Sequence, residues 1–231
     1  MERCAQLGLK GVALATFPNG RSYPTAEDDR FWAAAVALDM PITVHTSMSG
    51  SRGRSNEPSL QWPVEPQGLD RPPIDIIDRL ARYGTRHCGC LEAVQLIMAG
   101  VFHRFPKLRI YWAENQIGWI PIWLEQMDLI YEANWRWVAR IYGWKPLSQR
   151  PSDYVREFTY WGFFDDPAGI RMRYDLGVDR IMWGSDFPHE VSRWPRSVEV
   201  MEQQLAGVPE DEKHKILRGN ARQFFHLAKA H

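Results

Sequence analysis

The chain has 231 residues, and its 28 Lys and Arg residues balance its 28 Asp and Glu residues. Zero formal charge gives no reason to expect nucleic acid or an anionic membrane surface as a partner. No apolar run is long enough to span a membrane. The three cysteines are an odd number, which argues against a disulfide framework and fits a reducing cytosol. These features predict a cytoplasmic protein with a single domain over residues 1–231, and they leave a homo-oligomer open.

Short apolar runs alternate with longer amphipathic stretches along the chain. In chain order, the pattern predicts the strand Gly11–Thr16, the helix Ala26–Asp39 with Thr25 as its N-cap, the strand Pro41–Ser47, the helices Ile74–Tyr83 and Leu91–Phe105, the strand Leu108–Asn115, the helix Ile120–Ile141, the strand Phe158–Phe164, the helix Pro167–Leu176, the strand Arg180–Phe187, and the helices Ser197–Leu205 and Glu210–Ala230. The last of these helices is expected to break near Gly219–Asn220. Strands that are each followed by a helix predict a parallel α/β sheet covered by helices.

The sequence contains eleven tryptophans, which is a high number for this length. Aromatic side chains are used mainly for burial, so a bulky core is the first explanation. An aromatic-walled pocket is the alternative.

A long stretch rich in Ser, Gly, Pro and Arg, Met48–Pro73, follows the second predicted strand. A loop of this length inside a compact domain is usually functional or disordered. It is expected over the carboxyl end of the sheet, where α/β proteins bind ligands. Arg52 and Arg54 in this loop are candidates to clamp a substrate carboxylate, since the guanidinium fork suits that group. The alternative is a solvated basic loop.

Three polar residues stand at the ends of predicted strands. Strand alternation turns His45 away from the helix-packed face and toward the mouth of the sheet. Glu114 ends a second strand, with Tyr111 and Ala113 assigned to the opposite face, and Asp186 ends a third. The carboxyl ends of parallel strands meet at one edge, so an imidazole and two carboxylates are expected to converge there. Such groups bind Zn²⁺ or Mn²⁺, and a carboxylate can also act as an acid or base.

Each of these residues also has an ordinary explanation. A histidine at a strand end is often a hydrogen-bonded structural residue, as His45 would then be. Glu114 could pair with an arginine, and Asp186 after Gly-Ser could be a turn residue. His189 either helps to bind substrate and orient a ligand beside Asp186 or belongs to the same turn.

Four strings resemble, in the right order, the signatures of one family. They are MPITVHTS (Met40–Ser47), ENQIGWIPIWLEQMD (Glu114–Asp128), WGSDFPH (Trp183–His189) and GNARQFF (Gly219–Phe225). The family is the amidohydrolase-related group of the aminocarboxymuconate-semialdehyde decarboxylase type. The resemblance implies a (β/α)8 TIM barrel with one divalent metal, Zn²⁺ first and Mn²⁺ as the alternative.

The same resemblance implies residue roles. His45 matches a metal ligand of the fifth strand, and Asp186 matches the ligand and acid/base group of the eighth. Glu114 lies near the position where many members carry a catalytic histidine. The first-strand His-x-His pair has no counterpart before His45, and about five of eight β/α units are present. The chain is therefore expected to be the C-terminal portion of an incomplete barrel.

Two functional hypotheses follow. The first is a metal-dependent hydrolase or decarboxylase acting on a small carboxylated or aromatic compound, with Asp186 and Glu114 as catalytic groups. The second is a catalytically inactive fragment that lacks the first-strand metal ligands. A nucleotide-binding domain ranks last, because no glycine-rich phosphate loop follows any predicted strand.

Overall fold

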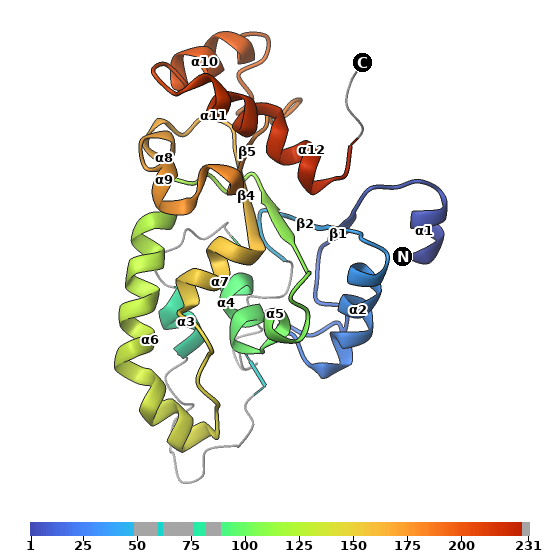
Figure 1. The fold of residues 1–231 in the computed structure, drawn as a ribbon, viewed down its shortest axis with the longest axis vertical. Helices are drawn as coiled ribbons and strands as arrows, with labels where there is room; N and C mark the ends of the chain where they lie inside the picture. The colour runs from blue at the N-terminus through green and yellow to red at the C-terminus, as the bar shows by residue number, and fades with distance from the viewer. Residues whose placement is uncertain (49–59, 62–75, 82–88, 228–231) are drawn as a thin grey trace.

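A sheet of five parallel strands forms the centre of the computed structural model, which describes residues 1–48, 60–61, 76–81 and 89–227 (Figure 1). Each strand pairs in parallel with the next one along the chain, in the order β1-β2-β3-β4-β5. The strands are β1 (Val12–Leu14), β2 (Ile42–His45), β3 (Ile110–Ala113), β4 (Thr159–Phe163) and β5 (Ile181–Trp183). The predicted α/β class is confirmed.

Helices connect the strands and cover the sheet. They are α1 (Glu2–Gln6), the 3₁₀ turn η1 (Ala26–Asp28), α2 (Asp29–Ala37), α3 (Ile76–Ala81), α4 (Cys90–Met98), α5 (Val101–Arg104), α6 (Ile120–Tyr142), α7 (Pro151–Phe158), α8 (Pro167–Arg171), α9 (Arg173–Leu176), the 3₁₀ turn η2 (Val178–Arg180), α10 (Ser197–Gln204), α11 (Glu210–His214), the π turn η3 (Lys215–Gly219) and α12 (Asn220–Phe224). Figure 1 shows α6 along one side of the molecule, α1 and α2 on the other, and α10 to α12 gathered at one end.

The predicted N-cap at Thr25 is confirmed. Its hydroxyl accepts a hydrogen bond from the Glu27 amide at 3.2 Å, and the Asp28 carboxylate accepts one from the Thr25 amide at 2.8 Å. This reciprocal pair is a capping box that fixes where the helix begins. By contrast, the single helix predicted over Leu91–Phe105 divides into α4 and α5, because Gly100 between them adopts a left-handed φ of 70°.

The outer face of the sheet packs against helices and forms the main core. Alternate strand residues are fully buried there, among them Ile42, Val44, Ile110, Trp112, Trp161 and Ile181. The indoles of Trp112 and Trp161 stack with ring centroids 5.1 Å apart. Trp32 and Trp123 are also completely buried. Bulk in the core therefore accounts for much of the tryptophan content.

The inner face of the sheet packs against the last helix. Tyr160 and Met182 from the strands contact Phe224 of α12, and Tyr111 packs against this cluster. The Asn220 side chain donates hydrogen bonds of 2.7 and 2.8 Å to the carbonyls of Val178 in η2 and Ile181 at the start of β5. These contacts hold α12 against the sheet.

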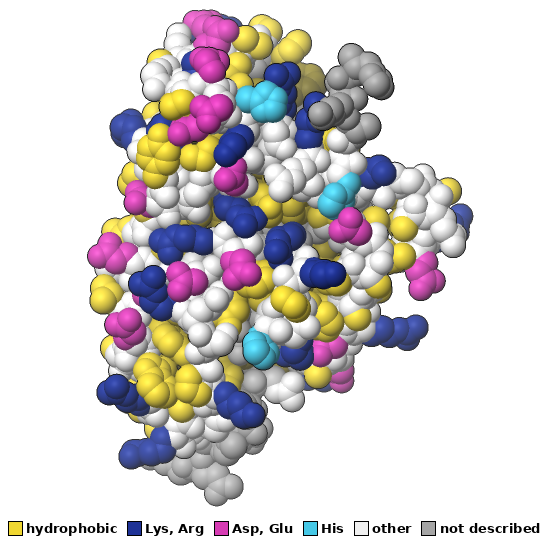
Figure 2. Space-filling view, viewed as in Figure 1, with side chains coloured by type: hydrophobic (Ala, Val, Ile, Leu, Met, Phe, Trp, Pro, Cys, Tyr) yellow, Lys and Arg dark blue, Asp and Glu magenta, His cyan; other side chains and the backbone are white. Residues whose placement is uncertain are grey.

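The edges and the surface complete the fold. Within the described ranges, β1 and β5 each pair with a single neighbouring strand, so the sheet is open rather than closed into a barrel. The helices of these ranges include none with the length and apolar character needed to cross a bilayer. On the face shown in Figure 2, positive and negative side chains are interspersed rather than segregated.

Candidate active site

His45 and Glu114 meet at the carboxyl edge of the sheet. His45 is the last residue of β2, where its exposed side chain follows the buried Val44, as the alternation predicted. Its Nε2 lies 3.1 Å from Glu114 Oε2, and the two side chains are 69% and 30% exposed. The partner of Glu114 is thus a histidine and not an arginine. An exposed pair of this kind adds little to stability, so its interest lies in its chemistry.

Several residues that follow the strand ends at this edge have a left-handed backbone conformation. Thr46, Glu114, Gln116 and Asp186 have φ values of 53°, 57°, 55° and 56°, and each follows the end of β2, β3 or β5. Non-glycine residues in this region cost on the order of 1–3 kcal/mol each and cluster at functional sites. These backbone conformations therefore fix the direction of the side chains in the loops at the carboxyl edge.

The left-handed turn at Glu114 corrects one prediction. The register pairs Thr43 with Tyr111 and His45 with Ala113, so these side chains share one face of the sheet. Assigning Tyr111 and Ala113 to the face opposite the site was wrong. The strand ends at Ala113, and simple alternation does not continue through Glu114.

Asp186 lies in a turn and not in a strand. β5 ends at Trp183, three residues earlier than Asp186, so the predicted strand Arg180–Phe187 was too long. The Asp186 carbonyl accepts a hydrogen bond of 2.8 Å from the His189 amide, which places both residues in one turn beyond the carboxyl end of β5. The Asp186 side chain is partly exposed, and His189 is exposed.

The described residues contain no group of three or more His, Cys, Asp or Glu side chains arranged to hold a metal ion. The structure thus joins His45 to Glu114 and does not bring Asp186 into a cluster with them. Arg52 and Arg54 lie outside the described residues.

Asn115 organises the backbone beside the pair. Its Nδ2 donates to the carbonyls of Thr46 at 3.0 Å and Ala113 at 2.7 Å, and its Oδ1 accepts from the Gly89 amide at 2.6 Å. The side chain is 4% exposed. It therefore ties together the ends of β2 and β3 and the start of α4. The sequence signal was a polar residue two positions after the strand end, which alternation alone does not interpret.

Asp166 fixes the next loop. Its Oδ2 accepts hydrogen bonds of 2.6 Å from the amides of both Ile117 and Gly118, and its Oδ1 accepts one of 2.8 Å from Gly169. One carboxylate thereby holds the loop after β3 against the start of α8. This loop connects Glu114 to α6.

Tyr111 reaches across the inner face beneath the pair. A Cβ at Gly162 would lie 2.3 Å from the Tyr111 hydroxyl oxygen and 3.1 Å from the Glu114 amide nitrogen. Burial raises the pKa of Tyr111 to about 12, and the negative charge of Glu114 adds to the shift. The phenol is therefore neutral at physiological pH and able to donate a hydrogen bond. Alternation along the sequence does not identify Gly162, because the residue that it contacts, Tyr111, lies on the neighbouring strand β3.

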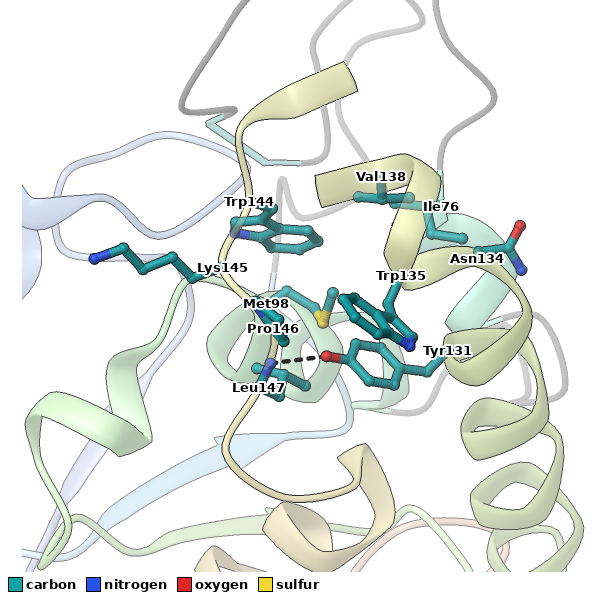
Figure 3. A pocket seen from close by; sticks show the side chains of 10 residues that line it. All are labelled: Ile76, Met98, Tyr131, Asn134, Trp135, Val138, Trp144, Lys145, Pro146 and Leu147. Atoms are coloured by element: carbon teal, nitrogen blue, oxygen red, sulfur yellow. Dashed lines mark hydrogen bonds between the residues drawn. The ribbon is translucent and has the colours of Figure 1, made fainter. Parts of the chain in front are cut away.

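An aromatic-lined cavity lies elsewhere, between the second half of α6 and the loop after it (Figure 3). Tyr131, Trp135 and Trp144 line it, and the Tyr131 hydroxyl accepts a hydrogen bond from the Leu147 amide at 2.7 Å. The Lys145 side chain points away from it (Figure 3). Because α6 begins at the carboxyl edge and runs back for 23 residues, about 34 Å, this cavity lies toward the amino end of the sheet. It is separate from the His45 edge.

Comparison with known proteins assigns the family. A family model described as amidohydrolase matches residues 1–227. The chain belongs to the amidohydrolase family. The resemblance inferred from the four sequence strings is therefore confirmed, and the carboxyl edge of this amidohydrolase chain is the edge at which barrels of this kind carry their active sites.

Individual relatives of this amidohydrolase chain are decarboxylases by name. It is 27% identical over 190 residues to a decarboxylase of Emericella nidulans, covering 80% of this chain and 52% of the relative. It is 25% identical over 244 residues to the gamma-resorcylate decarboxylase of Rhodococcus jostii, covering 98% and 65%. The chain thus spans about half to two thirds of the length of these relatives.

A solved structure supports the fold. The 5-carboxyvanillate decarboxylase of Novosphingobium aromaticivorans, complexed with manganese and 4-hydroxy-3-methoxy-5-nitrobenzoic acid, aligns with a TM-score of 0.66 at 23% identity. The alignment covers 98% of this chain and 59% of that one. The five-stranded sheet of this amidohydrolase chain therefore corresponds to part of that longer decarboxylase chain.

Proposed function

We propose that the chain carries the site of a decarboxylase for small aromatic carboxylic acids. The observation that carries the proposal is the contact of His45 with Glu114 at the carboxyl edge of a parallel sheet in an amidohydrolase chain. The names of the relatives favour decarboxylation over hydrolysis. The nitrobenzoic acid in the related structure supports an aromatic substrate.

The proposal includes one divalent metal. Manganese in the related structure makes Mn²⁺ the first ion to test and Zn²⁺ the second. Imidazole and carboxylate groups suit both ions. The described residues do not complete such a site, since no three donors cluster. We assign His45 and Asp186 as two ligands that need further donors, and we derive the chemistry below from the groups of this chain alone.

Decarboxylation of an aromatic acid needs a proton at one carbon. The bond between the ring carbon and the carboxylate breaks, CO₂ leaves, and the electron pair stays on the ring carbon. That carbon then takes up a proton from an acid at the site. Asp186 and Glu114 are the carboxyl groups assigned to this transfer, and water returns the proton after turnover. The neutral Tyr111 hydroxyl beneath Glu114 is suited to donate a hydrogen bond to a substrate oxygen.

A second candidate is an inactive fragment. It is tested because, among the described residues, no three metal donors cluster and β1 and β5 each pair with a single strand. An open parallel sheet exposes unpaired backbone groups, which favours association with another chain.

Metal content per chain separates the two candidates. The protein is loaded with Mn²⁺, gel-filtered and measured by mass spectrometry beside His45→Ala, Asp186→Ala and the control His103→Ala, an exposed histidine of α5. The decarboxylase proposal expects about one ion per chain, lost in the first two variants and retained in the control. Retention of little or no metal by the folded wild type would contradict it. Substrate binding by Arg52, Arg54 and His189, self-association and a cytoplasmic location stay predictions.

A further inference from the structure

A second concave surface lies outside the candidate active site, between helices α8, α9 and α10. It is a groove of about 540 Å³ whose apolar lining includes Ile170 and Val200. Its charged lining is dominated by four arginines, Arg171, Arg173, Arg193 and Arg196. The proposed decarboxylation gives none of these four residues a role.

Two of the arginines are held rigidly by acidic partners. Arg173 donates from Nε to Glu212 at 2.6 Å, from one terminal nitrogen to the Ile170 carbonyl at 3.0 Å, and from the other to the Tyr174 hydroxyl at 2.7 Å. Arg193 donates from Nε and Nη2 to Asp165 at 2.9 and 2.6 Å. Their guanidinium groups are thus fixed in place before any ligand arrives, which lowers the entropy lost on binding.

The other two are free to engage a ligand. Among the described residues, neither Arg171 nor Arg196 has an ion pair or hydrogen bond to another side chain, and both are exposed. The four lining arginines face two carboxylates, Asp165 within the groove and Glu212 behind Arg173. The groove therefore carries two positive charges that nothing within it balances.

We propose that this groove binds a small dianion. Guanidinium forks match the paired oxygens of phosphoryl and carboxylate groups, and two unbalanced positive charges match a doubly charged ligand. The apolar lining accommodates a compact hydrocarbon body beside the charges. A nucleic acid is a poor fit, because the chain as a whole has zero formal charge and the charges on the face shown in Figure 2 are interspersed.

The groove adjoins the loops of the candidate site. Asp165 follows β4, and Arg193 stands on the loop after β5 that also carries Asp186. A dianion held by Arg193 and Arg196 would therefore bind the far end of that loop. The inference stands independently of the decarboxylase proposal, since it needs neither metal nor turnover.

Calorimetric titration tests the inference directly. Inorganic phosphate and phthalate are titrated separately into the chelator-treated chain at fixed ionic strength. The variants are the double substitution Arg171→Gln with Arg196→Gln and the matched control Arg140→Gln, an exposed arginine near the end of α6. Unfolding curves without ligand establish that each variant is folded.

We expect saturable binding of at least one probe at one site per chain, weakened tenfold or more in the double variant and unchanged in Arg140→Gln. Binding of phosphate alone would identify a phosphoryl dianion, and binding of phthalate alone a dicarboxylate. The absence of saturable binding for both probes would overturn the proposal. Equal affinity in wild type and double variant would overturn it as well.

Discussion

Replacing Gly162 with alanine probes the packing beneath the candidate site. The added Cβ would lie 2.3 Å from the Tyr111 hydroxyl oxygen, 3.0 Å from its Cζ and 3.1 Å from the Glu114 amide nitrogen. Non-bonded carbon and oxygen atoms do not approach to 2.3 Å, so the tyrosine ring or the strand must move. The ring is confined by Phe224 and Phe225, with centroids at 5.9 and 6.2 Å.

Overpacking of this kind costs about 1–3 kcal/mol in the free energy of unfolding. The usual gain from replacing glycine with alanine, about 0.4–1 kcal/mol, offsets only part of that cost. Urea unfolding followed by tryptophan fluorescence measures the difference. Gly184→Ala is the matched control, because nothing lies within 4 Å of its added Cβ, and it should change stability little.

The double variant Gly162→Ala with Tyr111→Phe removes the atom at 2.3 Å and should recover part of the loss. A Gly162→Ala protein as stable as Gly184→Ala would refute the packing described here. A double variant no more stable than Gly162→Ala would show that the Tyr111 hydroxyl is not the group that the added methyl contacts.

Three further predictions concern polar side chains that accept hydrogen bonds from backbone amides. Asp166→Ala removes the acceptor of three backbone amides and should cost about 1–3 kcal/mol by urea unfolding; a loss no larger than that of the exposed Asp175→Ala would contradict this. Asn115→Ala should cost a similar amount in the same assay. Asn115→Asp should cost at least as much, because it places a buried carboxylate oxygen against the carbonyls of Thr46 and Ala113; an Asn115→Asp protein as stable as wild type would contradict this. Burial raises the pKa of Asp28 above its ordinary value, so its contribution to stability is full at low pH and is lost as pH rises through the folded pKa. The stability of wild type relative to Asp28→Asn should therefore fall as pH rises above 3.8, and a rising difference would count against this.

The periodicity of the sequence predicted most of the elements, for physical reasons visible in the structure. Buried parallel strands are continuous apolar runs, and all five were placed correctly along the chain. The helix α7 was missed because Arg150 and Pro151 look like loop residues, although proline is well suited to a first helical turn. A single domain over the whole chain stays a prediction.

The candidate site was less predictable than the fold. His45 was placed correctly because β2 keeps its alternation through its last residue. Glu114 and Asp186 follow their strands in left-handed turns, so alternation does not determine where their side chains point. The role of Gly162 depends on the hydroxyl of Tyr111 across the sheet, which is a tertiary contact that no local pattern contains.

Release of CO₂ tests the central claim most directly. The Mn²⁺-loaded chain is incubated with gamma-resorcylate and with 5-carboxyvanillate, the acids named for its relatives, beside His45→Ala, Glu114→Gln and His103→Ala. Positioned acid–base groups contribute about 10²–10⁴-fold to rate, so Glu114→Gln should lose at least about 10²-fold. His45→Ala should lose activity together with its metal, while His103→Ala retains full activity. A folded, metal-loaded chain that releases no CO₂ from either acid, or releases it equally in all variants, would contradict the assignment.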